Sequence, residues 1–156
     1  MKNLFYLLVA VFTLSLTSCW SDDDSSNDPE DELYIRFNLN GEQKEYMDPA
    51  TITSDRKLIL GDNQGSSDNG KISLWMPADI ETGTFTITDA TSTASNLETL
   101  YSADIWMDDE VIDASTGALV ITELDDEYVK GTFSFSGTND EGTSVTVTNG
   151  TFRAYR

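Results

Sequence analysis

The stretches YVKGTFSFSG at residues 128–137 and SVTVTNGTFRA at residues 144–154 alternate apolar and polar side chains with a period of two. In the first stretch, Val129, Phe133 and Phe135 fall on one face. Successive side chains of a β-strand point to opposite sides, so each stretch predicts a strand with one buried face. This part of the chain therefore predicts an all-β fold.

The second stretch changes the side of its apolar residues at a glycine. Val145 and Val147 occupy odd positions, whereas Phe152, which lies beyond Gly150, occupies an even one. A single extra residue in a strand moves every later side chain to the other face. The change therefore predicts a β-bulge or a tight kink at residues 149–150.

The same alternation recurs upstream, where the pair Asn40-Gly41 gives a strong signal for a two-residue hairpin turn. Residues 92–100 form the only segment with a weak helical pattern, a short turn. Further strands are expected at residues 33–39, 43–47, 57–60, 71–76, 83–88, 101–107 and 118–124. About eight to ten short strands bounded by turn residues indicate one antiparallel β-sandwich or one small β-barrel over residues 33–156. The alternation alone does not choose between these two folds.

The N-terminal segment has the pattern of a secretory signal peptide. Lys2 precedes an apolar run over residues 4–16, which small residues follow. Such a run spans only about 20 Å as a helix, against a hydrocarbon core of about 30 Å. Residues 1–18 are therefore expected to be removed rather than to span a membrane.

Cys19 is the only cysteine of the chain, so it has no partner for an intramolecular disulfide. The tetrapeptide Leu16-Thr17-Ser18-Cys19 resembles the lipobox of bacterial lipoproteins. The resemblance implies cleavage before Cys19 and acylation of its thiol, and several acyl chains hold a protein stably on a membrane. The alternative is an ordinary secretory peptide with a cysteine near its cleavage point.

Residues 19–32 are expected to form a disordered tether behind the anchor. Seven of the thirteen residues after Cys19 are acidic and none is aliphatic, so the segment has little to bury. The sequence Ser21-Asp22-Asp23-Asp24 resembles the export signal of surface lipoproteins in the Bacteroidota. The resemblance implies display on the cell surface, with the periplasmic face of the outer membrane as the alternative.

Composition removes several classes of function. The formal net charge of −19 repels nucleic-acid phosphates, so no nucleic-acid partner is expected. The chain has no histidine, which is the commonest general base and metal ligand, and an acylated Cys19 leaves no free thiol. With many acids, some pair will meet the spacing of a glycosidase by chance. No catalytic residue and no cofactor are therefore assigned.

Trp75 and Trp106 are candidates for a ligand platform. Each has the opposite parity from the aliphatic residues of its strand, which predicts a position on the outer face of a sheet. Together with Tyr101, Tyr128 and Tyr155, these rings offer large apolar faces with polar edges, which suit sugars. The alternative is that they pack in the core or against the rim of the sheets.

Acidic residues gather at Asp108, Asp109, Glu110 and Asp113, after a predicted strand. Calcium takes six to eight oxygen ligands, and such a loop can supply some of them. The spacing lacks the central glycine and terminal glutamate of an EF-hand loop. A solvated turn is the simpler interpretation, and no metal site is assigned.

Three C-terminal segments have a recognisable pattern: VITELD at residues 120–125, KGTFSF at residues 130–135 and VTVTNGTF at residues 145–152. Together they resemble a family of small β-rich lipoproteins of unknown function from the Bacteroidota. The resemblance implies an all-β domain in the cell envelope, and it supplies no catalytic residue.

These observations lead to an expected function. The chain is expected to be a lipoprotein of the outer membrane, anchored through its lipid and exposed on the surface, that acts as a binding or accessory module without catalysis. Its ligand is expected to be a glycan or a protein, because loops on a rigid scaffold suit capture. The alternative is a structural or envelope-interaction lipoprotein without a small-molecule ligand.

Overall fold

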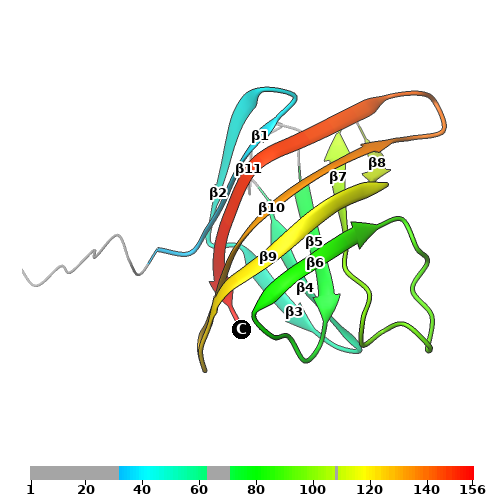
Figure 1. Ribbon diagram of the computed structural model, residues 1–156. Helices are drawn as coiled ribbons and strands as arrows, with labels where there is room; N and C mark the ends of the chain where they lie inside the picture. The colour runs from blue at the N-terminus through cyan, green and yellow to red at the C-terminus, as the bar shows by residue number, and fades with distance from the viewer. Residues whose placement is uncertain (1–31, 63–70, 108) are drawn as a thin grey trace, which may run out of the picture.

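Two antiparallel β-sheets face each other across one apolar core in the computed structural model, which describes residues 32–62, 71–107 and 109–156 (Figure 1). The larger sheet has six strands in the order β2-β1-β11-β10-β9-β6. Its strands are β1 (Tyr34–Leu39), β2 (Glu42–Met47), β6 (Gly83–Thr88), β9 (Thr116–Leu124), β10 (Tyr128–Thr138) and β11 (Ser144–Tyr155).

The smaller sheet has five strands in the order β3-β4-β5-β7-β8. Its strands are β3 (Ala50–Thr53), β4 (Arg56–Gly61), β5 (Lys71–Pro77), β7 (Ser102–Met107) and β8 (Glu110–Asp113). All neighbouring strands in both sheets pair antiparallel.

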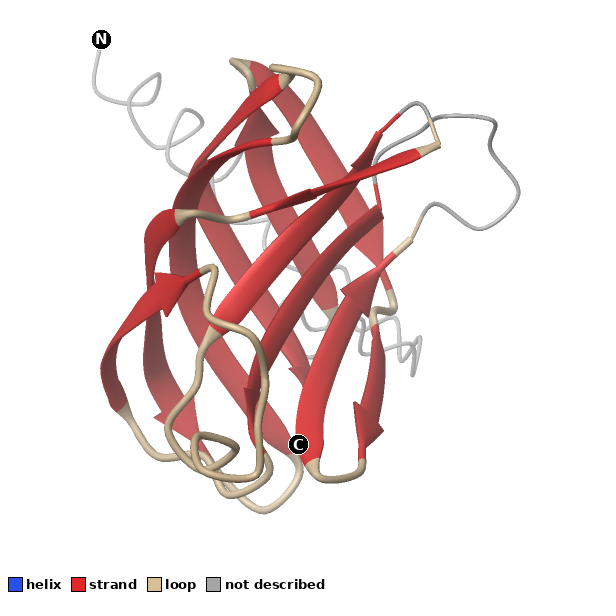
Figure 2. Cartoon of the chain, turned by 90° about the vertical axis from the view of Figure 1, so that its right-hand side faces the viewer, coloured by secondary structure: helices blue, strands red, loops and turns tan. Residues whose placement is uncertain are grey.

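The fold is a β-sandwich, since the two sheets do not close into a barrel (Figure 2). One isolated parallel bridge, between Ile87 and Tyr101, links the edge of the large sheet to the segment that enters β7. The described ranges contain no helix, and therefore no helix long and apolar enough to cross a membrane. The all-β prediction is confirmed. Of the two folds that the sequence left open, sandwich and barrel, the structure is a sandwich.

The predicted bulge is present in β11. Against β10, the pairing changes by one residue between Phe133↔Gly150 and Phe135↔Val147, and the pairing with β1 shifts at the same level. Asn149 is the extra residue, with a φ of 53°. Because of it, Val147 and Phe152 both point into the core despite their opposite parity.

The predicted hairpin at Asn40-Gly41 is also present. Leu39 pairs with Glu42, and both turn residues have positive φ angles of 50° and 88°. Positive φ at both central positions is the requirement of a type I′ turn, which matches the twist of the flanking strands. The side chain of Asn40 also accepts a hydrogen bond from the backbone N–H of Thr146, at 2.8 Å, which ties the turn to β11.

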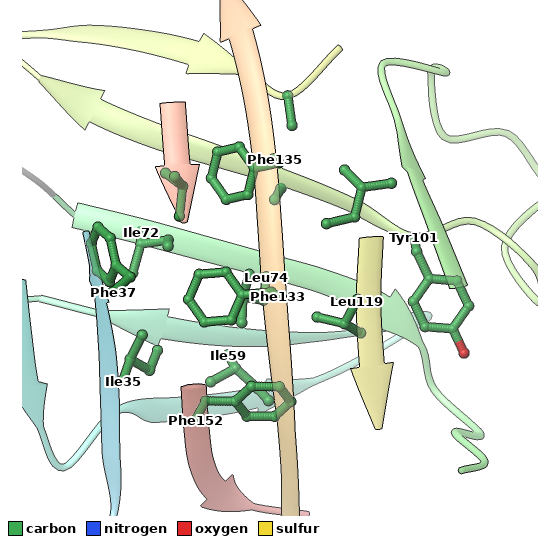
Figure 3. Packing of buried hydrophobic residues seen from close by; sticks show 14 of the residues in the cluster. Ile35, Phe37, Ile59, Ile72, Leu74, Tyr101, Leu119, Phe133, Phe135 and Phe152 are labelled. Carbon is green, nitrogen blue, oxygen red and sulfur yellow. The ribbon is translucent and has the colours of Figure 1, made fainter. Parts of the chain in front are cut away.

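The core lies between the sheets and is built from the alternate residues of both (Figure 3). Phe133 lies at its centre, with ring centroids 6.0 Å from Phe37 and 6.3 Å from Phe152. Opposite them, Ile72 and Leu74 of β5 are fully buried. Each such side chain stabilises the fold by about 1.5–3 kcal/mol through burial.

Three details differ from the sequence-based expectation. Strand β3 was not expected, and residues 110–113, expected as part of an acidic loop, form strand β8. Residues 92–100 form turns with one α-type hydrogen bond, from the N–H of Leu100 to the carbonyl of Asn96 at 2.9 Å, but no helix.

Candidate functional site

The outer faces of the two sheets differ in chemistry. The outer face of the six-stranded sheet carries exposed threonines and ion pairs, such as Lys130–Glu123 at 3.0 Å, and its exposed large apolar side chains are Met47 on β2 and Tyr155 at the end of β11. The outer face of the five-stranded sheet carries six apolar side chains instead. They are Ile52, Leu58, Leu60, Trp75, Trp106 and Val111. Contiguous exposed apolar surface of this kind marks interaction sites in soluble domains.

The strand register brings these side chains together. Ile52, Leu58 and Trp75 stand opposite one another on β3, β4 and β5, and Trp106 stands opposite Val111 on β8. Ile52, Trp106 and Val111 are 54%, 47% and 41% exposed. Both tryptophans therefore lie on the outer face, as their parity predicted.

A groove of about 400 Å³ runs over this face. Its walls are apolar, from Leu58, Leu60, Trp75, Trp106 and Val111. Its polar groups are few: Lys71, Ser73 and Asp104. Small-ligand sites have this size and this composition, with a few polar groups that orient the ligand among apolar walls.

Asp104 is the central polar residue of the groove, and sequence reasoning missed it. It lies on β7 opposite Ser73, and its Oδ2 accepts a hydrogen bond from the indole Nε1–H of Trp75 at 3.0 Å. Its Oδ1 is buried and accepts no hydrogen bond from the described residues. The indole bond holds Trp75 in place, and the buried Oδ1 leaves the carboxylate only partly hydrogen-bonded.

Burial raises the pKa of Asp104 above its usual range. The bond from Trp75 and the nearby polar groups of Ser73 and Trp106 oppose this rise, and the negative charge of Asp113 on the neighbouring strand adds to it. A carboxylate in a groove with a perturbed pKa is a recognised mark of a functional site. Its signal in the sequence was present, since Asp104 shares the outward parity of Trp106.

A second hollow of about 210 Å³ adjoins the groove and shares Trp75 and Asp104 with it. Its basic residue is Arg56, which is only 9% exposed and lies 5.6 Å from the ring centroid of Trp75. The guanidinium of Arg56 donates to the carbonyl of Leu100 at 2.8 Å and to Ser102 Oγ at 3.2 Å. Burial lowers the pKa of Arg56. The Arg56 guanidinium thus lies over the ring of Trp75 as a cation–π partner and helps to fix the orientation of that ring.

The tyrosines considered as part of the aromatic platform lie elsewhere. Tyr101 is buried and stacks on Phe85, with centroids 4.1 Å apart. Tyr128 stacks on Tyr155 at 5.5 Å, in strands of the six-stranded sheet. The structure therefore brings together the two tryptophans, without the tyrosines.

The acidic residues considered for calcium have different surroundings where the structure describes them. Asp108 lies outside the described residues, and Asp109 is in the turn between β7 and β8. Glu110 accepts a hydrogen bond from Asn139 Nδ2, and Asp113 lies beside Asp104 on the outer face. Within residues 32–62, 71–107 and 109–156, no three acids form a cluster that could hold a metal ion.

The residues assigned to processing and export also lie outside the described part of the chain. They are Leu16, Thr17, Ser18, Cys19, Ser21, Asp22, Asp23 and Asp24. Their roles remain predictions from the sequence.

The fold and the groove define a two-sheet antiparallel β-sandwich with an aromatic, acid-centred groove on the outer face of its smaller sheet. The chain belongs to a family of domains of unknown function (DUF6252), whose match covers residues 47–155. The match includes every strand that lines the groove. No curated protein and no solved structure has significant similarity to the chain.

Proposed function

We propose that this protein is an outer-membrane lipoprotein, exposed on the cell surface, that binds a glycan without chemical conversion. The observation that carries the proposal is the groove on the five-stranded sheet, in which Trp75 and Trp106 flank Asp104. Indole rings offer flat apolar faces to the C–H faces of sugar rings, and a carboxylate accepts hydrogen bonds from their hydroxyls.

The dimensions of the groove suit an extended ligand. Trp75 pairs with Ser102, so Trp75 and Trp106 are four residues apart along adjacent strands. At about 3.3 Å per residue and about 4.8 Å between strands, their Cα atoms are separated by roughly 14 Å. Two stacking positions at this separation favour a linear oligosaccharide over a single sugar.

The cellular location of the protein is inferred from its N-terminal sequence. The tetrapeptide ending at Cys19 supports lipidation, and the acidic run after it supports surface display, with the periplasmic face as the alternative. A tether over residues 19–32 would separate the domain from the membrane by up to about 40 Å, at about 3.3 Å per residue. Origin in the Bacteroidota and membership of the small lipoproteins of that group are part of the same proposal.

Glycan-array binding of the purified domain tests the proposed function. Trp75→Ala and Trp106→Ala should each reduce binding at least tenfold, because each removes a stacking face. Tyr34→Ala is the matched control, since it removes an aromatic ring from the six-stranded sheet. Equal binding by all variants would place the glycan elsewhere.

The rival function is an envelope-interaction protein without a small ligand. The observation in its favour is that the apolar surface extends past the groove to Ile52 on the edge strand β3. A blank array, together with one envelope protein that co-purifies with the wild type and not with Ile52→Asp, would favour this rival.

A further inference from the structure

We infer that the groove selects a glycan that bears a protonated amine, with Asp104 as the counter-ion and the two indole rings as walls. This inference deepens the proposed function and rests on it. It commits to an amino sugar as the ligand, because the groove offers both a negative charge and flat stacking faces.

The first argument is the unsatisfied charge of Asp104. Oδ2 is bonded to Trp75, and the buried Oδ1 has no hydrogen-bond partner in the described part of the chain. None of the ion pairs among the described residues includes Asp104. A half-buried carboxylate without a counter-ion costs free energy, and a bound cation would remove that cost.

The second argument concerns the charged groups around Asp104. Lys71 on β5 is engaged with Asp62 at 3.2 Å, and Arg56 on β4 donates to Leu100 and Ser102. Asp113 on β8 adds negative charge, and Asp89, which lines the adjoining hollow, adds more. Lys71 is therefore neutralised by Asp62, whereas Arg56 is bonded only to neutral oxygens among the described residues. The three acids Asp104, Asp113 and Asp89 outnumber this one unpaired cation and favour a positive ligand.

The third argument is the aromatic wall. A cation within about 6 Å of an indole centroid is attracted to the face of the ring, by roughly 0.5–2 kcal/mol depending on desolvation. Trp75 and Trp106 both line the groove that contains Asp104. Acid and indole faces together discriminate an ammonium group from a neutral amide, which lacks the charge.

The experiment compares two probes by titration calorimetry at pH 6. The trimer of glucosamine carries protonated amines, and the trimer of N-acetylglucosamine is its neutral counterpart. The wild type should bind the glucosamine trimer at least tenfold more tightly, and Asp104→Asn should abolish this preference while binding of the neutral trimer persists. Asp126→Asn, in an exposed turn of the same acidic protein, should retain the preference and so controls for non-specific attraction.

The outcomes separate the inference from the proposed function. Equal, tryptophan-dependent binding of both trimers would overturn the amine inference and leave glycan binding standing. Binding of neither trimer, or of any array glycan, would overturn both. Tight binding of a lysine-containing peptide with no binding of either sugar would overturn the amino-sugar ligand and favour a protein partner.

A measurement on the wild type covers the case in which Asp104→Asn fails to fold. Affinity for the glucosamine trimer should fall as the pH drops through the raised pKa of Asp104, because protonation removes the counter-ion. Asp113, Asp89, Lys71 and Arg56 also face this region, so the neutral trimer serves as reference. A parallel loss of affinity for both trimers would contradict the inference.

Discussion

Asp104 is a residue that function explains better than stability does. Replacing it with an uncharged side chain would remove a half-buried negative charge that takes part in none of the ion pairs among the described residues. Most proteins avoid such a charge unless it is paired. Its presence between two tryptophans therefore points to a ligand that supplies the missing partner.

The substitution Asp104→Asn should stabilise the protein at neutral pH. The folded-state pKa of Asp104 is raised, so the stability that its protonation provides is fully present below the ordinary carboxyl pKa and is lost as the pH rises through the raised value. Asparagine can still accept the bond from Trp75. Urea unfolding at pH 7 and pH 4 should show a stabilisation of the variant at pH 7 that shrinks at pH 4. A variant that is less stable at pH 7 would contradict this account of the residue.

Gly150 is a second residue with a specific prediction. A Cβ atom there would lie 2.5 Å from the carbonyl oxygen of Phe133 and 2.5 Å from its ring. The carbonyl belongs to a paired strand and cannot move away freely. Gly150→Ala should therefore reduce the free energy of unfolding by about 1–3 kcal/mol in urea denaturation. Thr148→Ala, at an exposed position of the same strand, is the control, and equal stability of both variants would refute the close approach.

At the scale of elements, alternation was sufficient where a strand has one buried and one exposed face. It predicted β1, β5, β6, β10 and the bulge of β11. Strand β9 loses its alternation of buried and exposed residues after Ile121, because a second register shift lies between Lys130↔Glu123 and Gly131↔Ile121. A bulge of this kind moves the later side chains to the other face, so the alternation of apolar and polar residues is interrupted in the sequence.

The short strands β3 and β8 could not be predicted in this way. Each has four residues and lies at an edge of the five-stranded sheet. None of the β3 residues is fully buried, and in β8 only Ile112 is. Edge strands with so little burial carry almost no periodic signal. The pairing that chose sandwich over barrel is likewise a long-range property.

The site was partly predictable for a related reason. Outward parity located Trp75 and Trp106, because the faces of a strand follow from its local sequence. Asp104 could have been found in the same way, since it lies two residues before Trp106 on β7, but Leu58 and Val111 come from the separate strands β4 and β8. The contacts of Leu58 and Val111 with the tryptophans follow only from the order and register of the strands.

The hairpin that joins β1 and β2 gives a prediction at this scale. Gly41 has a φ of 88°, in a region that residues with a Cβ atom adopt at a cost. Gly41→Ala should destabilise the domain by about 1 kcal/mol, measured by urea denaturation. Gln43→Ala, in the exposed part of β2, should have a much smaller effect. If the two substitutions are equivalent, the turn geometry does not limit the hairpin.

In the whole molecule, the two sheets have different outer faces. The outer face of the six-stranded sheet is rich in threonines and ion pairs, and the five-stranded sheet presents the groove. A tether over residues 19–32 would let the sandwich orient this groove away from the membrane. The proposed anchor and the proposed groove therefore serve one function, which is capture at the cell surface.

The anchor gives a prediction for the intact protein. Cys19→Ser should move the protein from the membrane fraction to the soluble fraction and remove the mass of the acyl groups, because the acylated thiol is gone. Ser25→Ala, a change of similar size in the tether, should leave both properties unchanged. Unchanged fractionation and mass for Cys19→Ser would exclude the lipid anchor.

The central claim, that the outer face of the five-stranded sheet binds a glycan, is tested most directly by NMR of the indole N–H groups. The chain has three tryptophans, so three indole signals report on Trp20, Trp75 and Trp106. Titration with the glycan that binds best on the array should shift the signals of Trp75 and Trp106 and leave that of Trp20 in place. Saturation with the glycan without any shift at Trp75 and Trp106 would contradict the claim.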